Sequence, residues 1–174
     1  AIGPKNVELT AEIADGWLPI FFSPQKFEAI YGPSIEAGLA KAGKSIADLD
    51  IAPTVSVVIT DNLSEGYNSL RPLLALYIGG MGAKGKNFYY DLAVRYGYEA
   101  EAAEIQEMYL DRNIGGAMMK VPEALIDEVA LVGPKERVRE RLQPWLDSPV
   151  TTMNLTVQDA EALRTMVELV GELT

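Results

Sequence analysis

The segment at the amino end has the residue types of a phosphate-binding loop. Residues 1–6, Ala-Ile-Gly-Pro-Lys-Asn, lead from an apolar stretch into a predicted helix. A helix N-terminus presents unpaired N–H groups and the positive end of the helix dipole, which favour a bound phosphate. Gly3 allows close approach of the backbone, and Asn6 offers a side-chain donor. The alternative is an ordinary strand-to-helix turn, because these six residues contain neither a dinucleotide-binding fingerprint nor a P-loop.

A second candidate is a glycine-rich segment that precedes a group of aromatic residues. Residues 79–87 hold four glycines together with Lys84 and Lys86, and Tyr89 and Tyr90 are among the aromatics that follow. This composition predicts a mobile loop that holds an anionic ligand under an aromatic lid. The alternative is a flexible connection between two helices, with solvated lysines and with aromatics that belong to the core.

Acidic and hydroxyl side chains give two weaker candidates. The glutamates between residues 99 and 107, together with Asp111, could hold a metal or act as an acid–base pair. The charged outer face of a helix explains the same spacing better, so no metal site is predicted. Ser23, which precedes Pro24 at a predicted helix start, is either an N-cap or a phosphate ligand.

The composition excludes several kinds of chemistry. The 174 residues include no cysteine and no histidine, which excludes disulfides, thiolate or imidazole metal ligands, and cysteine or histidine catalysis within this chain. Lys and Arg number 15 against 25 Asp and Glu, and this net charge of −10 argues against a nucleic-acid partner. Neither an apolar run of ~20 residues nor a signal-peptide pattern is visible, so a cytoplasmic location and no membrane contact are expected.

Hydrophobic patterning predicts strands that alternate with helices. Continuous apolar runs at 17–22, 51–60 and 150–157 are typical of strands covered on both faces in a parallel sheet. Helices are expected at 4–14, at 23–42 with a break at Gly32-Pro33, in several pieces over 64–130, at 134–146 and at 158–173. If residues 1–3 end a further strand, the chain supplies about half of the strands of a (β/α)8 barrel.

Several stretches resemble the luciferase-like monooxygenase superfamily. Residues 2–9 and 14–19 carry the clearest likeness, and residues 38–49, 77–98 and 131–134 support it, so the likeness spans nearly the whole chain. The closest resemblance is to the branch of coenzyme F-420-dependent oxidoreductases of actinobacteria and methanogens.

The resemblance implies an α/β fold, namely the C-terminal half of a TIM-like (β/α)8 barrel formed by residues 1–174. Residues 1–3 would end the fifth strand, and the runs at 17–22, 51–60 and 150–157 would be the sixth to eighth strands. Residues 64–130 would be a helical insertion before the last strand that helps to frame a substrate pocket.

The resemblance also implies a cofactor and the residues that hold it. By position, Ile2, Gly3, Pro4 and Asn6 would cradle the phosphate of coenzyme F-420, with Ser23 as a weaker assignment after the sixth strand. The implied reaction is hydride transfer between the deazaflavin ring and a small organic substrate. Ring-holding and catalytic residues are expected on the first four strands, upstream of this chain, which alone is expected to be inactive.

The same likeness implies a substrate pocket. Trp17, Tyr89 and Tyr90 would form its walls. The charge of Lys84 and Lys86, rather than the likeness, predicts that they neutralise an anionic substrate or the polyglutamate tail of the cofactor.

Two alternatives stay open. An FMN-dependent monooxygenase has the same fold, and no residue of this chain excludes it. A non-catalytic half-barrel would instead be a binding or assembly module. Its open sheet edges would pair with the missing N-terminal half of the barrel or with a second copy, as in a homodimer.

Overall fold

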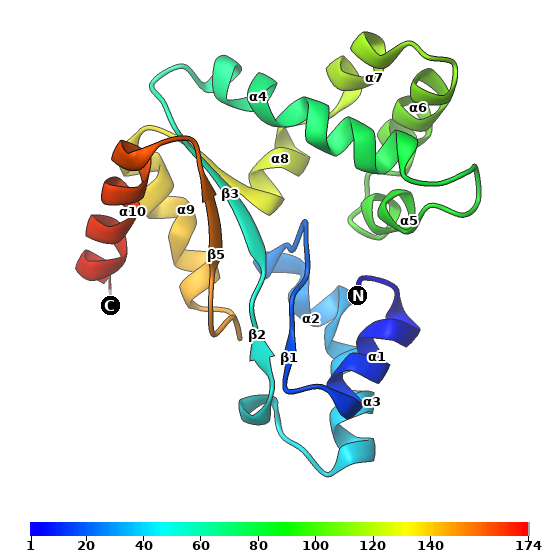
Figure 1. Ribbon diagram of the computed structural model, residues 1–174, viewed down its shortest axis with the longest axis vertical. Helices are drawn as coiled ribbons and strands as arrows, with labels where there is room; N and C mark the ends of the chain where they lie inside the picture. Colours follow the sequence, from blue (N-terminus) through cyan, green and yellow to red (C-terminus); the bar gives the residue numbers. More distant parts are fainter. Residues whose placement is uncertain (174) are drawn as a thin grey trace.

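The computed structural model describes residues 1–173 as an α/β fold built around parallel strands (Figure 1). The strands are β1 (Gly16–Trp17), β2 (Asp50–Ile51), β3 (Thr54–Ile59), β4 (Ala130–Gly133) and β5 (Asn154–Val157). β1 pairs with β2, and β3 pairs with both β4 and β5, in each case in parallel. Figure 1 shows helices on both sides of the strands and a further group of helices beyond the carboxyl end of β3. The predicted alternation of strands and helices is confirmed.

The helices follow the predicted order. They are α1 (Pro4–Ile13), α2 (Phe27–Ile30), α3 (Gly32–Ala42), α4 (Leu63–Ala75), α5 (Phe88–Arg95), α6 (Glu99–Leu110), α7 (Ile114–Lys120), α8 (Glu123–Val129), α9 (Lys135–Leu146) and α10 (Ala160–Leu173). Short 3-10 helices occupy Pro24–Lys26 and Ile46–Asp48, and a π-helix, Leu76–Gly80, continues α4. Over residues 1–173, no helix has the length and apolar character that a membrane span requires.

Two consecutive strands, β2 and β3, form the middle of the fold, with only Ala52 and Pro53 between them. The amides of Ala52 and Thr54 donate to the carbonyls of Trp17 and Pro19, so the pairing with residues 17–20 continues across this break. Thr54 pairs with Ile20 and also with Asn154 of β5, so these two residues flank the strand on opposite sides. Two residues further on, Ser56 pairs with β4 on one side and with β5 on the other. β4 therefore continues the edge that the chain leaves after Ile20.

The strand predicted at 17–22 ends earlier than expected. Its last pairing is at Ile20, because Phe21 has a φ of 54°, in the left-handed region, and a strand does not contain that conformation. The Tyr96 hydroxyl donates to the Phe21 carbonyl at 2.8 Å, which holds this turn. The prediction of a strand through Phe22 is therefore wrong at its carboxyl end.

β4 was not predicted. The sequence predicts helix up to residue 130 and again from 134, yet all four residues of β4 are buried and lie in parallel register with β3. The apolar run of four residues, 129–132, is too short for periodicity to separate a strand from the end of a helix.

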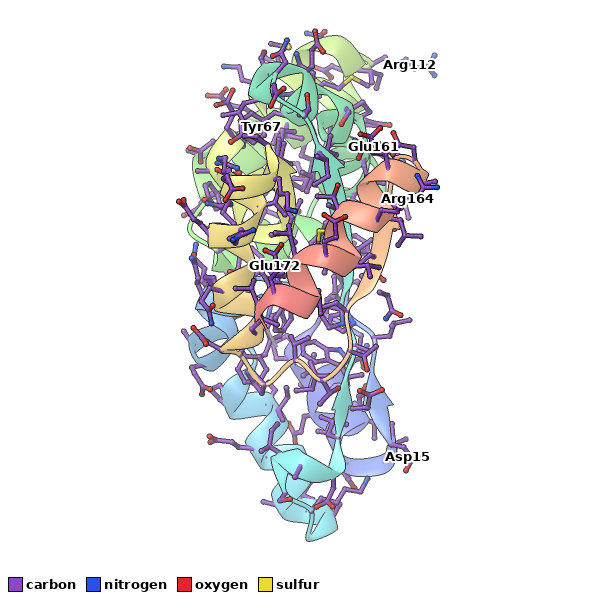
Figure 2. All side chains as sticks on the ribbon, turned by 90° about the vertical axis from the view of Figure 1, so that its left-hand side faces the viewer. Asp15, Tyr67, Arg112, Glu161, Arg164 and Glu172 are labelled. Atoms are coloured by element: carbon purple, nitrogen blue, oxygen red, sulfur yellow. The ribbon has the colours of Figure 1, made fainter. Side chains whose placement is uncertain are left out.

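Ion pairs join α9 and α10 on the outside of the sheet. Lys135 donates to Glu168 at 2.9 Å, and Arg139 pairs with Glu172. Figure 2 shows α10 from outside, with Glu172 on the side of α9 and Glu161 and Arg164 at the other end of the helix. These pairs are exposed, and solvent screens the attraction between their charges, so they contribute little to stability.

α1 and α3 pack closely enough that one position accepts only glycine. A Cβ on Gly38 would lie 2.1 Å from the Glu8 carbonyl oxygen and 2.8 Å from the Ala11 Cβ. Both neighbours belong to α1, whose backbone cannot move away without disturbing the buried residues around it.

We expect the substitution Gly38→Ala to lower the free energy of unfolding by about 2–4 kcal/mol, because the new methyl group overpacks the contact with α1. Urea unfolding measures the change. The matched control is Gly171→Ala in α10, where a Cβ meets nothing within 4 Å. Alanine should stabilise that helix by roughly 0.5–1 kcal/mol. Equal effects at the two positions would contradict the close packing.

Candidate functional site

The amino-terminal loop is held from inside through its carbonyl groups. The indole Nε1–H of Trp17 donates to the Ala1 carbonyl at 2.8 Å, and Arg95 Nη2 donates to the Ile2 carbonyl at 2.8 Å. Trp17 is itself buried and makes an edge contact with the Tyr31 ring. The path of the loop is thus fixed by one residue of the sheet and one residue of α5.

Several amides of the loop are left without a protein acceptor. Within residues 1–173, the N–H groups of Ile2, Gly3 and Lys5 donate no hydrogen bond to the protein. The Gly3 carbonyl accepts from the amides of Asn6 and Val7 at 3.0 and 2.9 Å, which starts α1. An anion placed here would meet free amides and the positive end of the dipole of α1.

A pocket of about 300 Å³ opens beside this loop. Its lining residues are Ala1, Ile2, Gly3, Asn6, Leu18, Ile20, Phe88 and Tyr89. The structure therefore brings together four of the predicted site residues, Ile2, Gly3, Asn6 and Tyr89. Pro4, another predicted site residue, is not among the lining residues. It occupies the first position of α1, where its missing N–H costs no hydrogen bond.

The other predicted pocket residues lie outside this cavity. Trp17 is in the core, where it supports the loop and lines no described cavity. Tyr90 is half-buried, and its amide donates to the side chain of Asn87. Lys84 and Lys86 are exposed on the turn before α5, and neither forms an ion pair with residues 1–173.

Ser23 is buried beneath a pair of tyrosines. Its amide donates to the Tyr96 hydroxyl at 3.1 Å, and the hydroxyls of Tyr31 and Tyr96 are 2.8 Å apart. The Ser23 hydroxyl has no partner in the described part of the chain and does not cap the following turn. Burial raises the pKa of Tyr31 to about 12, and burial together with Tyr31 raises the pKa of Tyr96 well above its usual value.

The glycines of residues 79–85 serve close packing and a tight turn. A Cβ on Gly79 or Gly80 would lie 2.5 Å from atoms of Tyr109 in α6. A Cβ on Gly82 would lie 2.5 Å from the Lys86 carbonyl oxygen, and Gly85 has a φ of 77°. The structure thus gives each glycine a local reason, while binding of an anion by the lysines of this segment stays a prediction.

Asn87 is the residue that fixes this segment, and the sequence did not single it out. Its Nδ2 donates to the carbonyls of Tyr77 and Ile78 at 2.9 and 2.8 Å, which closes the π-helix. Its Oδ1 accepts from the amides of Tyr89 and Tyr90, which caps α5.

Gly80, Gly82 and Gly85 have the G-x-G-x-x-G spacing of a dinucleotide-binding loop. A π-helix precedes them, however, and Asn87 already uses the amides that would meet a phosphate.

A second cavity, of about 200 Å³, lies between the strands and α4. Its lining residues are Ile20, Phe21, Thr54, Ser56, Leu70, Leu73, Leu74, Val129, Ala130 and Thr156. Ile20 lines both cavities, so the two adjoin each other on one face of the sheet.

The glutamates of α6 do not form a metal site. Glu104 pairs with Lys120 of α7 at 2.5 Å, and Glu99, Glu101 and Glu107 are exposed or half-buried on the helix surface. No group of three or more metal-ligating side chains occurs among residues 1–173.

Parallel strands, crossover helices and a helical insertion define the chain as part of a (β/α)8-type barrel. The family model for luciferase-like monooxygenases matches residues 1–152, and the chain belongs to this family. It is 39% identical, over 98% of its length, to a Mycobacterium tuberculosis protein named as a coenzyme F-420-dependent oxidoreductase. It is 25% identical to the 5,10-methylenetetrahydromethanopterin reductase of Archaeoglobus fulgidus over 99% of its length.

The solved structures show the same fold. The coenzyme F-420-dependent tetrahydromethanopterin reductase of Methanopyrus kandleri superposes with a TM-score of 0.72 at 24% identity, covering 99% of this chain and 48% of that one. The chain likewise covers 49% of the Mycobacterium tuberculosis relative and 51% of the Archaeoglobus fulgidus relative. It spans about half the length of the curated relatives it matches.

We expect Asn87→Ala to lower the free energy of unfolding by about 2–4 kcal/mol, because it removes a cap and leaves two carbonyls without donors. Asn113→Ala is the matched control, since the Asn113 side chain only caps α7 through Gly116. Its cost should be about 1 kcal/mol. Thermal or urea unfolding of both variants tests the difference, and equal costs would show that the contacts to the π-helix contribute nothing.

The raised pKa of Tyr31 predicts a loss of stability at alkaline pH. Its folded value is about 12 against an ordinary value of 10.0, so the folded state keeps a proton that the unfolded state releases. The stabilising contribution of protonated Tyr31 is complete below pH 10 and is lost as pH rises towards 12. In the Tyr31→Phe variant, the free energy of unfolding should fall less steeply over this range, by up to about 1.4 kcal/mol per pH unit. Parallel stability curves for the two proteins would contradict this assignment.

Proposed function

We propose that this chain supplies the phosphate-binding part of a coenzyme F-420-dependent oxidoreductase. The observation that carries the proposal is the amino-terminal loop, where the amides of Ile2, Gly3 and Lys5 lack acceptors at the start of α1. The names of the relatives, which span reductases of methanogenic archaea and a mycobacterial oxidoreductase, support coenzyme F-420 over FMN as the cofactor.

The residues of the loop fit a phosphate group. The free amides supply donors without a fixed charge, and the exposed Asn6 side chain lines the same pocket. Gly3 has a φ of −75° and ψ of 142°, an ordinary extended conformation. A side chain there would meet only the Phe88 ring, at 3.6 Å. Glycine therefore serves to leave room in the pocket rather than to permit an unusual backbone.

When bound, the deazaflavin supplies hydride chemistry, and the protein contributes position and surroundings. Ile2, Gly3 and Asn6 would hold the phosphate, while Trp17 and Arg95 position the loop through its carbonyls. The apolar residues Leu18 and Phe88 line the same pocket and would exclude water from the bound group. Lys84 and Lys86, exposed and unpaired among the described residues, would face an anionic tail of the ligand in solvent.

The proposed enzyme also needs a partner for the open sides of the sheet. Leu9 and Ile13 of α1 are 49% and 69% exposed, and Leu163 and Val167 of α10 are 47% and 66% exposed. Figure 1 places these two helices on opposite sides of the strands. We propose that the other half of a barrel covers them; a second copy of this chain is the alternative. Size-exclusion mass of the isolated chain distinguishes a monomer, which would contradict obligate pairing, from a dimer.

The cofactor is tested by fluorescence titration of the natural polypeptide that carries these residues, with coenzyme F-420 and FMN in parallel. We expect coenzyme F-420 to bind more tightly, and Gly3→Glu to weaken binding at least about 100-fold, because a carboxylate would occupy the phosphate position. Gly115→Glu is the control, because that site in α7 has open space around it. Tighter binding of FMN would show that FMN, and not coenzyme F-420, is the cofactor. Unchanged binding of coenzyme F-420 by the Gly3→Glu variant would show that the loop is not part of the site.

A further inference from the structure

The cavity under α4 has a lining with no charged side chain. Leu70, Leu73 and Leu74 lie at the i, i+3 and i+4 spacing that puts them on one face of α4, and they form its roof. Ile20 and Phe21 close it on the side of the loop pocket. None of the acidic or basic residues within 1–173 lines it, and neither Lys84 nor Lys86 does so.

The floor of this cavity carries three hydroxyl groups. Thr54 and Ser56 are two residues apart on β3 and therefore face the same side of the sheet. Thr156 of β5 is the register partner of Ser56. None of the three hydroxyls hydrogen-bonds to another part of residues 1–173, although many hydroxyl side chains elsewhere in the chain do. The cavity thus offers polar groups only at its floor.

The position of the cavity relates it to the cofactor pocket. Ile20 lines both, and Tyr89, which lines the loop pocket, packs edge-on against Phe21 at a centroid distance of 6.1 Å. A molecule held under α4 would therefore lie next to whatever the amino-terminal loop binds.

We infer that this cavity binds the apolar portion of an uncharged organic substrate. The leucines of α4 would cover its hydrocarbon part, and a carbonyl or hydroxyl of the substrate would hydrogen-bond to the floor. The inference rests on the proposed function for the identity of the neighbouring cofactor, but the cavity itself is defined by its own residues. A carboxylate or phosphate on the buried part of the substrate would lose its hydration with no cation to replace it.

The test compares two probes of equal carbon number, 2-octanone and octanoate, by calorimetric titration of the natural polypeptide without cofactor. We expect 2-octanone to bind at least about 30-fold more tightly than octanoate, because the buried carboxylate is unpaired. Ser56→Ala should weaken the binding of 2-octanone about 3- to 10-fold, because a hydrogen bond to the ligand is lost. No binding of 2-octanone at millimolar concentration, or binding of octanoate as tight as that of the ketone, would overturn the inference.

A pair of charge substitutions localises the effect. Leu73 is 37% exposed at the cavity and Leu76 is 38% exposed one turn further on, outside the lining. Leu73→Arg should reduce the preference for 2-octanone at least about 10-fold by offering octanoate a cation, whereas Leu76→Arg should leave it unchanged. Equal effects of both variants would overturn the assignment to this cavity.

Titration with coenzyme F-420 in the same samples separates the two proposals. Binding of coenzyme F-420 without a preference for the ketone contradicts only the substrate class. A ketone preference that responds to Leu73→Arg, in a protein that does not bind coenzyme F-420, supports the cavity and contradicts the proposed cofactor.

Discussion

The pairing of the central strand along both of its edges is the constraint on which the rest of the structure depends. Phe21 turns the chain away after Ile20, which would leave the carboxyl half of β3 with one open edge. β4 fills that edge, and β4 is the segment by which the chain returns from α8. The helices α4 to α8 must therefore begin after the carboxyl end of β3 and end before the amino end of β4, which are adjacent parallel strands.

The helical group and the sheet are joined by polar contacts at the site itself. Arg95 donates to the Ile2 carbonyl, and the Tyr96 hydroxyl hydrogen-bonds to the backbone of Phe21 and Ser23.

A further contact joins the two parts. Lys26 donates to Glu128 at 2.8 Å, next to the Tyr98 ring. Burial and the hydrogen bond to Glu128 raise the pKa of Tyr98. The loop that we propose to bind phosphate thus owes its shape to residues of an insertion as much as to the barrel.

The sequence predicted the element order well, because long helices such as α4 and α10 have clear periodicity, and Pro4, Gly32 and Gly133 mark boundaries. It predicted the loop residues Gly3 and Asn6, since a strand-to-helix junction is a local pattern. β4 and the contact of Arg95 escaped it for a common reason. Each depends on a partner that is distant in sequence, and Arg95 is 93 residues from the carbonyl it holds. From the sequence, Gly79 and Gly80 predict a mobile loop. In the structure they instead allow the backbone to pack closely against the Tyr109 side chain.

The separation in sequence of these contacts has a consequence for folding. The Ser23 amide and the Tyr96 hydroxyl are 73 residues apart, and Ile51 meets Thr151 across 100 residues. Contacts of such long range carry a large loop-closure entropy and slow the folding of a domain. The helices can form early from local interactions, but the amino-terminal loop receives its supports only once the chain has closed these long loops. The proposed phosphate site is therefore expected to be among the last parts of the molecule to form after synthesis.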